Sequence, residues 1–143
     1  MRRSISRSRT KRREKTLNIF IREDSSLPIY EQIVSAVKTS ILNHEIAPGD
    51  MLPSIRSLAK DLGISVITTK RAYEELEKLG LIYSEQGRGF FVSRFNPNLL
   101  LEEQLKTLET HLEDIVREAK NLNLSPGELT DMIRLLWDKE VDR

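Results

Sequence analysis

The sequence predicts a mainly α-helical protein with a small β wing, in which a winged helix-turn-helix domain is followed by a C-terminal helical hairpin. Three observations predict this class. Residues 46–93 place two short amphipathic helices around a glycine turn and then two apolar strands around a glycine-rich loop. Residues 101–122 carry an apolar heptad, and a second capped helix follows them. We expect a basic arm at 1–16, the winged domain at 17–95 and a two-helix dimerisation region at 96–143.

The first segment, residues 1–16, is rich in arginine and serine. Its first fifteen residues carry eight basic side chains against one acidic side chain, Glu14, and too few apolar ones to bury a core. We expect a disordered arm that adds salt-sensitive phosphate contacts, or one with no specific role. Alternatively it is a non-native extension, since a purine-rich ribosome-binding site can encode Arg12-Arg13-Glu14 and Leu17 can be an alternative start codon. N-terminal sequencing of the natively expressed protein distinguishes these interpretations.

The first predicted helix has Pro28 in its first turn, a position that suits proline. Before it, residues 17–21 alternate weakly, which predicts a short strand or a lead-in. Apolar residues then recur at helical spacing, at Ile29, Ile33, Val37 and Ile41. We expect this helix to pack under the helix-turn-helix and stabilise it.

Turn and cap residues set the boundaries of the helix-turn-helix. Pro48-Gly49 predicts a type II turn, because proline presets φ and glycine accepts the positive φ. Ser54 can cap a helix that Gly63 ends, and Ser65 can cap a second helix that ends at Gly80. The predicted apolar faces are Ile55, Leu58, Ala59 and Leu62 in the first helix and Thr69, Ala72, Tyr73, Leu76 and Leu79 in the second.

The predicted wing is a hairpin. Residues 81–85 and 90–93 read as strands, and the loop Gln86-Gly87-Arg88-Gly89 between them holds two glycines.

The outward face of the second helix is the candidate DNA-reading surface. Recognition helices make most base contacts near their N-terminus, and the residues there are Ser65, Val66, Ile67, Thr68, Lys70 and Arg71. Arg56, in the first turn of the preceding helix, is placed to clamp a phosphate or a guanine. Arg88, at the wing tip, can reach a minor groove, whose negative potential attracts arginine.

These segments carry a family resemblance over roughly residues 27–94. The stretches LPSIRSLAKDLGIS, TTKRAYEELEKLGLI and GRGFFV resemble the winged helix-turn-helix of the GntR family of bacterial transcriptional regulators. The resemblance implies a DNA contact at Arg56, base or phosphate contacts at the recognition-helix start (Ser65, Thr68 and Lys70) and a wing contact at Gly87 and Arg88. It also implies repression.

The pair Val66-Ile67 departs from the family pattern, because some members have arginine at the first position and polar residues are usual at the second. Exposed apolar side chains here would suit thymine methyl groups rather than guanine. We therefore expect a thymine at this step of the half-site. The alternative is that the pair is buried against the wing.

The C-terminal region carries an apolar heptad seam, with spacings of four and three residues. Ser125-Pro126-Gly127-Glu128 then has the residues of a capping box, which starts a second helix with one apolar face. Such a hairpin buries too little on its own, so we expect it to form a homodimer that places two recognition helices on a palindromic site. The alternative is that it folds back on its own winged domain. The predicted dimerisation residues are Leu101, Leu105, Leu108, Leu112, Ile115, Leu122, Leu129, Ile133, Leu136 and Trp137, with Ala119 and Met132 on the same faces.

This short two-helix tail, together with the stretch AYEEL in the second helix of the helix-turn-helix, is similar to the YtrA subfamily of GntR regulators. Members of that subfamily lack a large ligand-binding domain and tend to be linked to transporter operons.

Composition limits the other functions. The net charge is +1, but residues 98–143 hold six basic against eleven acidic side chains, which fits a protein that touches DNA on one side. There is no cysteine, and the two histidines, His44 and His111, have no neighbours at ligand or catalytic spacing. We expect no enzyme activity, no cofactor and no metal, and a cytoplasmic location without membrane contact. A cleft between the hairpin and the winged domain could admit a small-molecule effector, although no residue set specifies one.

Together these features predict a sequence-specific, homodimeric DNA-binding regulator, most simply a repressor that occludes its promoter. The competing class is a protein-interaction module that uses the heptad hairpin, with the winged helix as a docking surface. A steep fall of duplex affinity with salt, with preference for one palindrome, distinguishes the regulator from the module.

Overall fold

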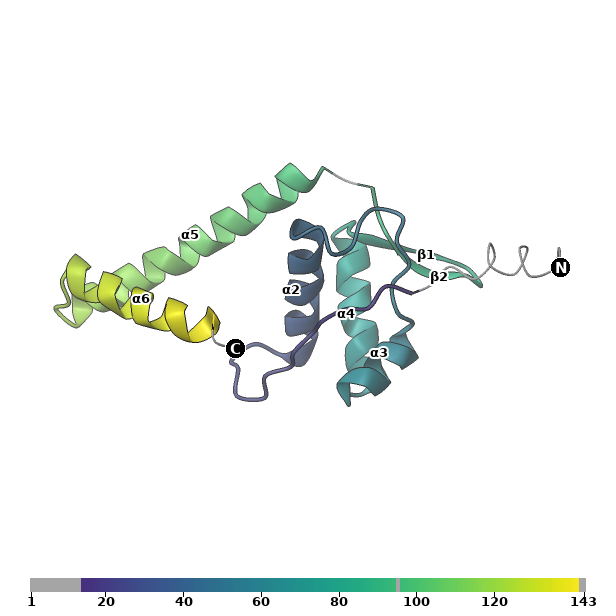
Figure 1. Ribbon diagram of the computed structural model, residues 1–143, viewed down its shortest axis with the longest axis horizontal. Coiled ribbons are helices and arrows are strands. Elements are labelled where there is room, and N and C mark those ends of the chain that lie inside the picture. The colour runs from purple at the N-terminus through teal and green to yellow at the C-terminus, as the bar shows by residue number, and fades with distance from the viewer. Residues whose placement is uncertain (1–13, 95, 142–143) are drawn as a thin grey trace. The chain divides into compact units, whose positions relative to one another are not determined.

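A computed structural model describes residues 14–94 and 96–141, and the chain divides into two compact units, Met1–Leu100 and Leu101–Arg143. In chain order the described elements are α2 (Ile29–Leu42), α3 (Ile55–Leu62), α4 (Val66–Lys78), β1 (Ile82–Glu85), β2 (Gly89–Val92), α5 (Pro97–Asn121) and α6 (Pro126–Val141) (Figure 1). Most of the predicted basic arm lies outside the described residues. The predicted mainly helical class with a small β wing is confirmed.

The core of the first unit lies between α2 and α4, which pack side by side, with α3 against α4 (Figure 1). The helical stripes that the sequence predicts are the faces that meet there. The largest fully buried side chains are Tyr73, Ile33, Ile46, Leu52, Leu76, Val37, Val92 and Thr69. The segment before α2 is a lead-in and not a strand: Leu17 and Ile19 are buried in this core, but residues 17–21 pair with no strand.

The predicted caps are present. The Ser54 side chain accepts a hydrogen bond from the Ser57 amide, and Gly63 ends α3 with a φ of 66°. Two details of the prediction are wrong. Pro28 is the N-cap residue of α2 rather than part of its first turn. Leu79, predicted on the apolar face of α4, is 51% exposed, because the helix ends at Lys78 and the chain turns away.

The wing is an antiparallel hairpin in which Ile82 pairs with Val92 and Glu85 with Gly89. The first strand is one residue shorter than predicted, because Leu81 precedes β1. The second is shifted by one residue: Gly89 belongs to β2 rather than to the loop, and Ser93 lies outside the strand. A third segment joins it. The amide of Leu52 donates to the Phe90 carbonyl at 2.9 Å, and Met51 bridges Phe91. The segment that leads into α3 therefore fixes the wing beside the helix-turn-helix.

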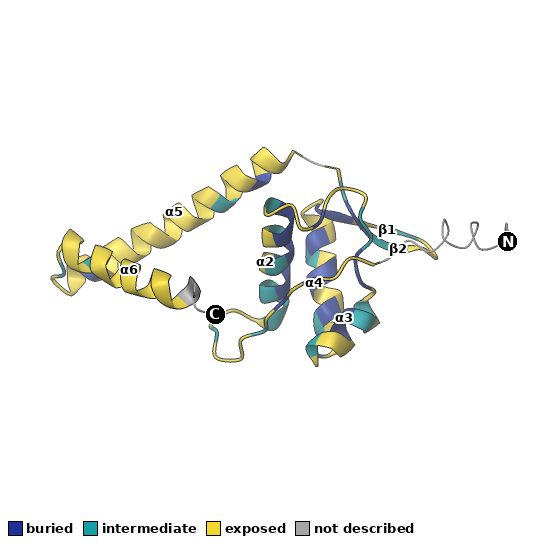
Figure 2. Ribbon diagram, in the orientation of Figure 1, coloured by how far each residue is buried: buried dark blue, intermediate teal, exposed yellow. Residues whose placement is uncertain are grey.

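The second unit is the remainder of α5, a tight turn and α6. The predicted capping box is present: the Glu128 amide donates to Ser125 Oγ at 3.1 Å, and the Ser125 amide donates to Glu128 Oε1 at 3.4 Å. α6 leaves the turn at an angle to α5, so the two helices share little contact (Figure 1). Within this unit Ala119 is buried beside the turn, whereas nearly all the other residues of both helices are exposed (Figure 2). No helix within the described ranges has the length and apolar composition needed to cross a membrane.

Candidate nucleic-acid interface

The candidate DNA-reading surface is the exposed side of α4 with the residues around its start. Two hydroxyl side chains organise that start. Ser65 Oγ accepts a hydrogen bond from the Thr68 amide at 3.1 Å and donates to Thr68 Oγ1 at 2.8 Å. The cap satisfies one of the orphan amides of the first turn and gives the helix a defined beginning.

The opposite side of α4 is anchored in the core. Thr69, Ala72, Tyr73 and Leu76 are buried, as predicted. The Tyr73 hydroxyl donates a hydrogen bond to the carbonyl oxygen of Pro53, and its ring meets Phe90 of the wing edge-on, with centroids 4.8 Å apart. Burial raises the pKa of Tyr73, so the phenol stays neutral. One side chain thus connects α4, the segment that leads into α3 and the wing.

The apolar pair at the start of α4 faces away from this core. Ile67 is 81% exposed and Val66 is 48% exposed. The alternative that the pair is buried against the wing is therefore wrong. Among the described residues, both side chains are therefore open to contact with another molecule, as readout of a base edge requires.

The basic side chains that are predicted to contact DNA differ in their contacts within the chain. Lys70 Nζ lies 4.0 Å from Glu74 Oε1, and Arg88 Nη1 lies 3.1 Å from Glu85 Oε2. The Arg71 guanidinium carbon lies 3.9 Å from the centroid of the Tyr30 ring, without an ion pair to any described carboxylate. The side chain of Arg56 is exposed and makes no hydrogen bond or ion pair with another described residue. Exposed ion pairs contribute at most about 1 kcal/mol, so a phosphate can replace either carboxylate.

The wing tip is formed by a glycine turn. Gly87 has a φ of 76°, and the Arg88 amide donates to the Glu85 carbonyl at 2.9 Å. Arg88 is therefore displayed at the end of the hairpin as predicted. The structure thus places all the predicted contact residues on α3, α4 and the wing of the first unit. It adds two features that were not predicted, the Tyr73 hydroxyl bond and the stacking of Arg71 on Tyr30, and no sequence spacing signals contacts between such distant positions.

Comparison with known proteins agrees with this fold. The family described as bacterial regulatory proteins, gntR family, matches residues 29–92. The HTH-type transcriptional repressor YtrA of Bacillus subtilis is 34% identical over 117 residues, which are 82% of this chain and 86% of that protein. A GntR family transcriptional regulator from Listeria monocytogenes has a TM-score of 0.62 at 31% identity, covering 78% of this chain and 96% of that one. The structure of YtrA from Sulfolobus acidocaldarius, a GntR-family transcription factor, has a TM-score of 0.53 at 33% identity and covers 66% of this chain and 99% of that one.

These relatives are named as transcription regulators, and the region matched by the family contains the whole helix-turn-helix and wing. The chain therefore belongs to the GntR family and is a DNA-binding transcription regulator of the YtrA type rather than an enzyme.

Proposed function

We propose that this protein is a transcriptional repressor that binds a palindromic operator as a homodimer, with the start of α4 in the major groove. The observation that carries the proposal is the exposed apolar start of α4, with Ile67 projecting outward. Basic residues surround it on three elements, Arg56 on α3, Lys70 on α4 and Arg88 on the wing. This is the arrangement of base-reading and phosphate-contacting groups that a major-groove helix requires.

The homodimer is supported by the apolar faces that the second unit leaves uncovered. The two helices of this unit share too little contact to bury them against each other. Pairing of two copies would bury them and would relate two copies of α4 by a two-fold axis, as a palindromic site requires. The exposed seam residues are Leu101, Leu105, Leu108, Leu112, Ile115, Leu122, Ile133, Leu136 and Trp137, with Leu129 partly buried.

Repression, by occlusion of the promoter, is supported by the similarity to a Bacillus subtilis protein that bears the name of a repressor. Control of a transporter operon rests on the resemblance to the YtrA subfamily alone. A cytoplasmic location fits a protein that acts on chromosomal DNA. A small-molecule effector remains a proposal without an assigned site.

Selection of bound sequences from a random duplex pool tests the proposal. The expected result is one palindrome, whose affinity falls steeply with salt as phosphate counterions are released. Arg56→Ala should weaken binding to the palindrome, whereas Lys139→Ala, a matched loss of charge in the last turn of α6, should leave the affinity unchanged. A duplex affinity that changes little with salt and shows no sequence preference would instead favour the protein-interaction module.

Thymine readout by Val66 and Ile67 is tested on the selected half-site. Each thymine is replaced by uracil, which lacks the C5 methyl group but keeps the hydrogen-bonding edge. At the position that these side chains touch, the affinity should fall, and Ile67→Ala should abolish the difference between thymine and uracil. Equal affinities at every position would contradict this readout.

A further inference from the structure

We infer that Tyr30 is a positioning residue, whose ring holds the Arg71 guanidinium ready for a DNA phosphate at the edge of the groove that α4 enters. The inference rests on the proposed docking of α4. Its basis is the stacking of the two groups, 3.9 Å from the guanidinium carbon to the ring centroid. A cation this close to a tyrosine face is attracted by the ring quadrupole, which limits the orientations of a long and flexible side chain.

The position of Arg71 suits a DNA contact. It lies four residues after Ile67, so the two side chains share one exposed face of α4, with Arg71 one turn farther from the helix start. This greater distance from the reading end places it against the backbone rather than the base edges. Stacking leaves the five N–H donors at the rim of the guanidinium plane, where they can reach phosphate oxygens.

Arg71 differs in this respect from its neighbour on α4. Lys70 Nζ lies 4.0 Å from the Glu74 carboxylate on the same helix, which offsets part of its positive charge. Arg71 is oriented by a neutral ring instead, and no carboxylate of the described residues lies within ion-pair distance of it. It therefore keeps its full charge for DNA, while the contact with the ring has already removed part of its conformational freedom.

Tyr30 is itself held in place. It lies in the first turn of α2, which packs side by side with α4. Its hydroxyl donates a hydrogen bond to Glu31 Oε1 at 3.1 Å, and this bond is the main reason that the pKa of Tyr30 is raised. The ring is thus neutral, and one of its edges is fixed.

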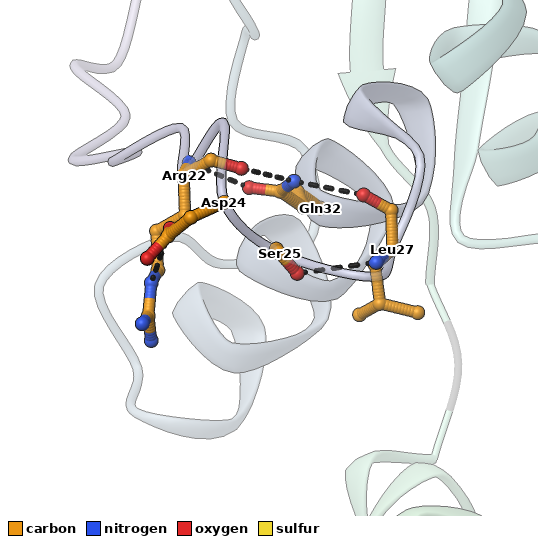
Figure 3. Close-up of polar contacts among 5 residues, drawn as sticks. All are labelled: Arg22, Asp24, Ser25, Leu27 and Gln32. Atoms are coloured by element: carbon orange, nitrogen blue, oxygen red, sulfur yellow. Dashed lines mark hydrogen bonds and ion pairs between the residues drawn. The ribbon is translucent and has the colours of Figure 1, made fainter.

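The first turn of α2 is held by the side-chain amide of Gln32, which bonds to the backbone of the loop that precedes the helix (Figure 3). Gln32 Nε2 donates to the carbonyl oxygens of Arg22 and Leu27, both at 3.0 Å, and Oε1 accepts from the Arg22 amide at 2.8 Å. Ser25 Oγ accepts from the Leu27 amide within the same loop. These bonds place the start of α2, and with it the Tyr30 ring, at a constant position beside α4.

A double-mutant cycle tests the inference, with affinity measured for the selected palindrome and for an unrelated duplex over a range of salt concentrations. Arg71→Ala should lower both affinities about tenfold, as expected for one charge-assisted contact to phosphate. It should also reduce the slope of log affinity against log salt by about 0.9. Tyr30→Leu should lower affinity severalfold, Tyr30→Phe should stay within twofold of the wild type, and Tyr30→Leu with Arg71→Ala should bind no more weakly than Arg71→Ala alone.

The matched control is Lys78→Ala, which removes a cation from the last turn of the same helix and should change neither the affinity nor the slope. Thermal unfolding of every variant reports on the fold separately. An unchanged affinity and slope in Arg71→Ala, or additive losses in the double variant, would overturn the role of Tyr30 and Arg71. In that case the wild-type preference for a palindrome would still support the proposed function. If the wild type shows no preference for a palindrome, the proposed function, with α4 in the major groove of an operator, is itself contradicted.

Discussion

The two units of this protein are built from amphipathic helices of the same periodicity, yet the apolar faces of these helices are buried in the first unit and largely exposed in the second. In the first unit Ile33 of α2 and Leu76 of α4 are completely buried. In the second, Leu108 of α5 and Leu136 of α6 are 53% and 60% exposed. The first unit brings three helices, a lead-in and a wing together, whereas the second has two helices that diverge from a turn. An apolar stripe thus predicts which side of a helix will be covered, and the number of surrounding elements decides whether the same chain covers it.

The largest expected effect is in the first unit. Ile33→Ala should lower the free energy of unfolding by about 2–5 kcal/mol, because it leaves a cavity in a closely packed core. Urea denaturation followed by circular dichroism, at one protein concentration, measures the change. The matched control in the second unit is Leu135→Ala, at a position that is 67% exposed and off the predicted seam, which should stay within about 0.5 kcal/mol of the wild type. Equal losses in both variants would contradict the contrast between the units.

In the second unit a seam residue should affect association more than folding. Leu108→Ala removes one leucine from each half of the proposed dimer. At about 1.5–3 kcal/mol per buried leucine, we expect a dissociation constant at least about a hundredfold higher. Sedimentation equilibrium measures it, and Thr110→Ala, on the polar side of α5, is the control. If Leu108→Ala associates like the wild type, the seam does not form the dimer.

Removal of the Tyr73 hydroxyl tests how much its hydrogen bond to Pro53 contributes to stability. Tyr73→Phe removes the bond to Pro53 and leaves a buried carbonyl without its partner, so we expect a loss of about 1–2 kcal/mol at neutral pH. Tyr83→Phe, on the exposed side of β1, should change the stability by less than about 0.5 kcal/mol.

The stability difference between the wild type and Tyr73→Phe should depend on pH. Burial raises the pKa of Tyr73 in the folded state, while the unfolded tyrosine ionises near pH 10. The stabilisation is therefore fully present below about pH 10 and is lost as the pH rises further, because the unfolded state releases its proton first. The difference in unfolding free energy between wild type and Tyr73→Phe should narrow above about pH 10. A constant difference there would contradict a buried, neutral phenol.

The smallest effects come from two glycines, one in each unit, and they should differ in sign. Gly63 has a φ of 66° and open space around a Cβ, so Gly63→Ala should lose about 1 kcal/mol through backbone strain alone. Gly127 lies in the first turn of α6 without a positive φ, and its Cβ would meet only Ser125 Oγ at an ordinary 3.8 Å. Gly127→Ala should therefore raise the stability of α6 by up to about 1 kcal/mol. Thermal unfolding of both variants checks the difference, and a loss of stability at Gly127 would contradict it.

The boundaries of the helices were predictable because they depend on contacts only a few residues apart. Ser54, Ser65 and Ser125 cap the helices expected of them, since a hydroxyl reaches an amide three residues along the chain in any surroundings. Leu79 was wrongly placed on the apolar face of α4, because the helical spacing of apolar residues continues past Lys78, where the helix ends. The pairing of Leu52 with Phe90 was missed because nothing local indicates which distant segment meets the exposed edge of a hairpin.

The candidate site shows the same division. The amino-acid sequence by itself determined α4, its capping and the residue types on its outer face, because helical geometry converts spacing into direction. Only the tertiary structure decided that the wing leaves Ile67 uncovered and that Tyr73 joins three elements. It also decided that the Arg71 guanidinium lies over the ring of a tyrosine from another helix, α2. Those outcomes depend on which helices pack together, and that is set by the sum of many weak contacts between residues far apart in the chain.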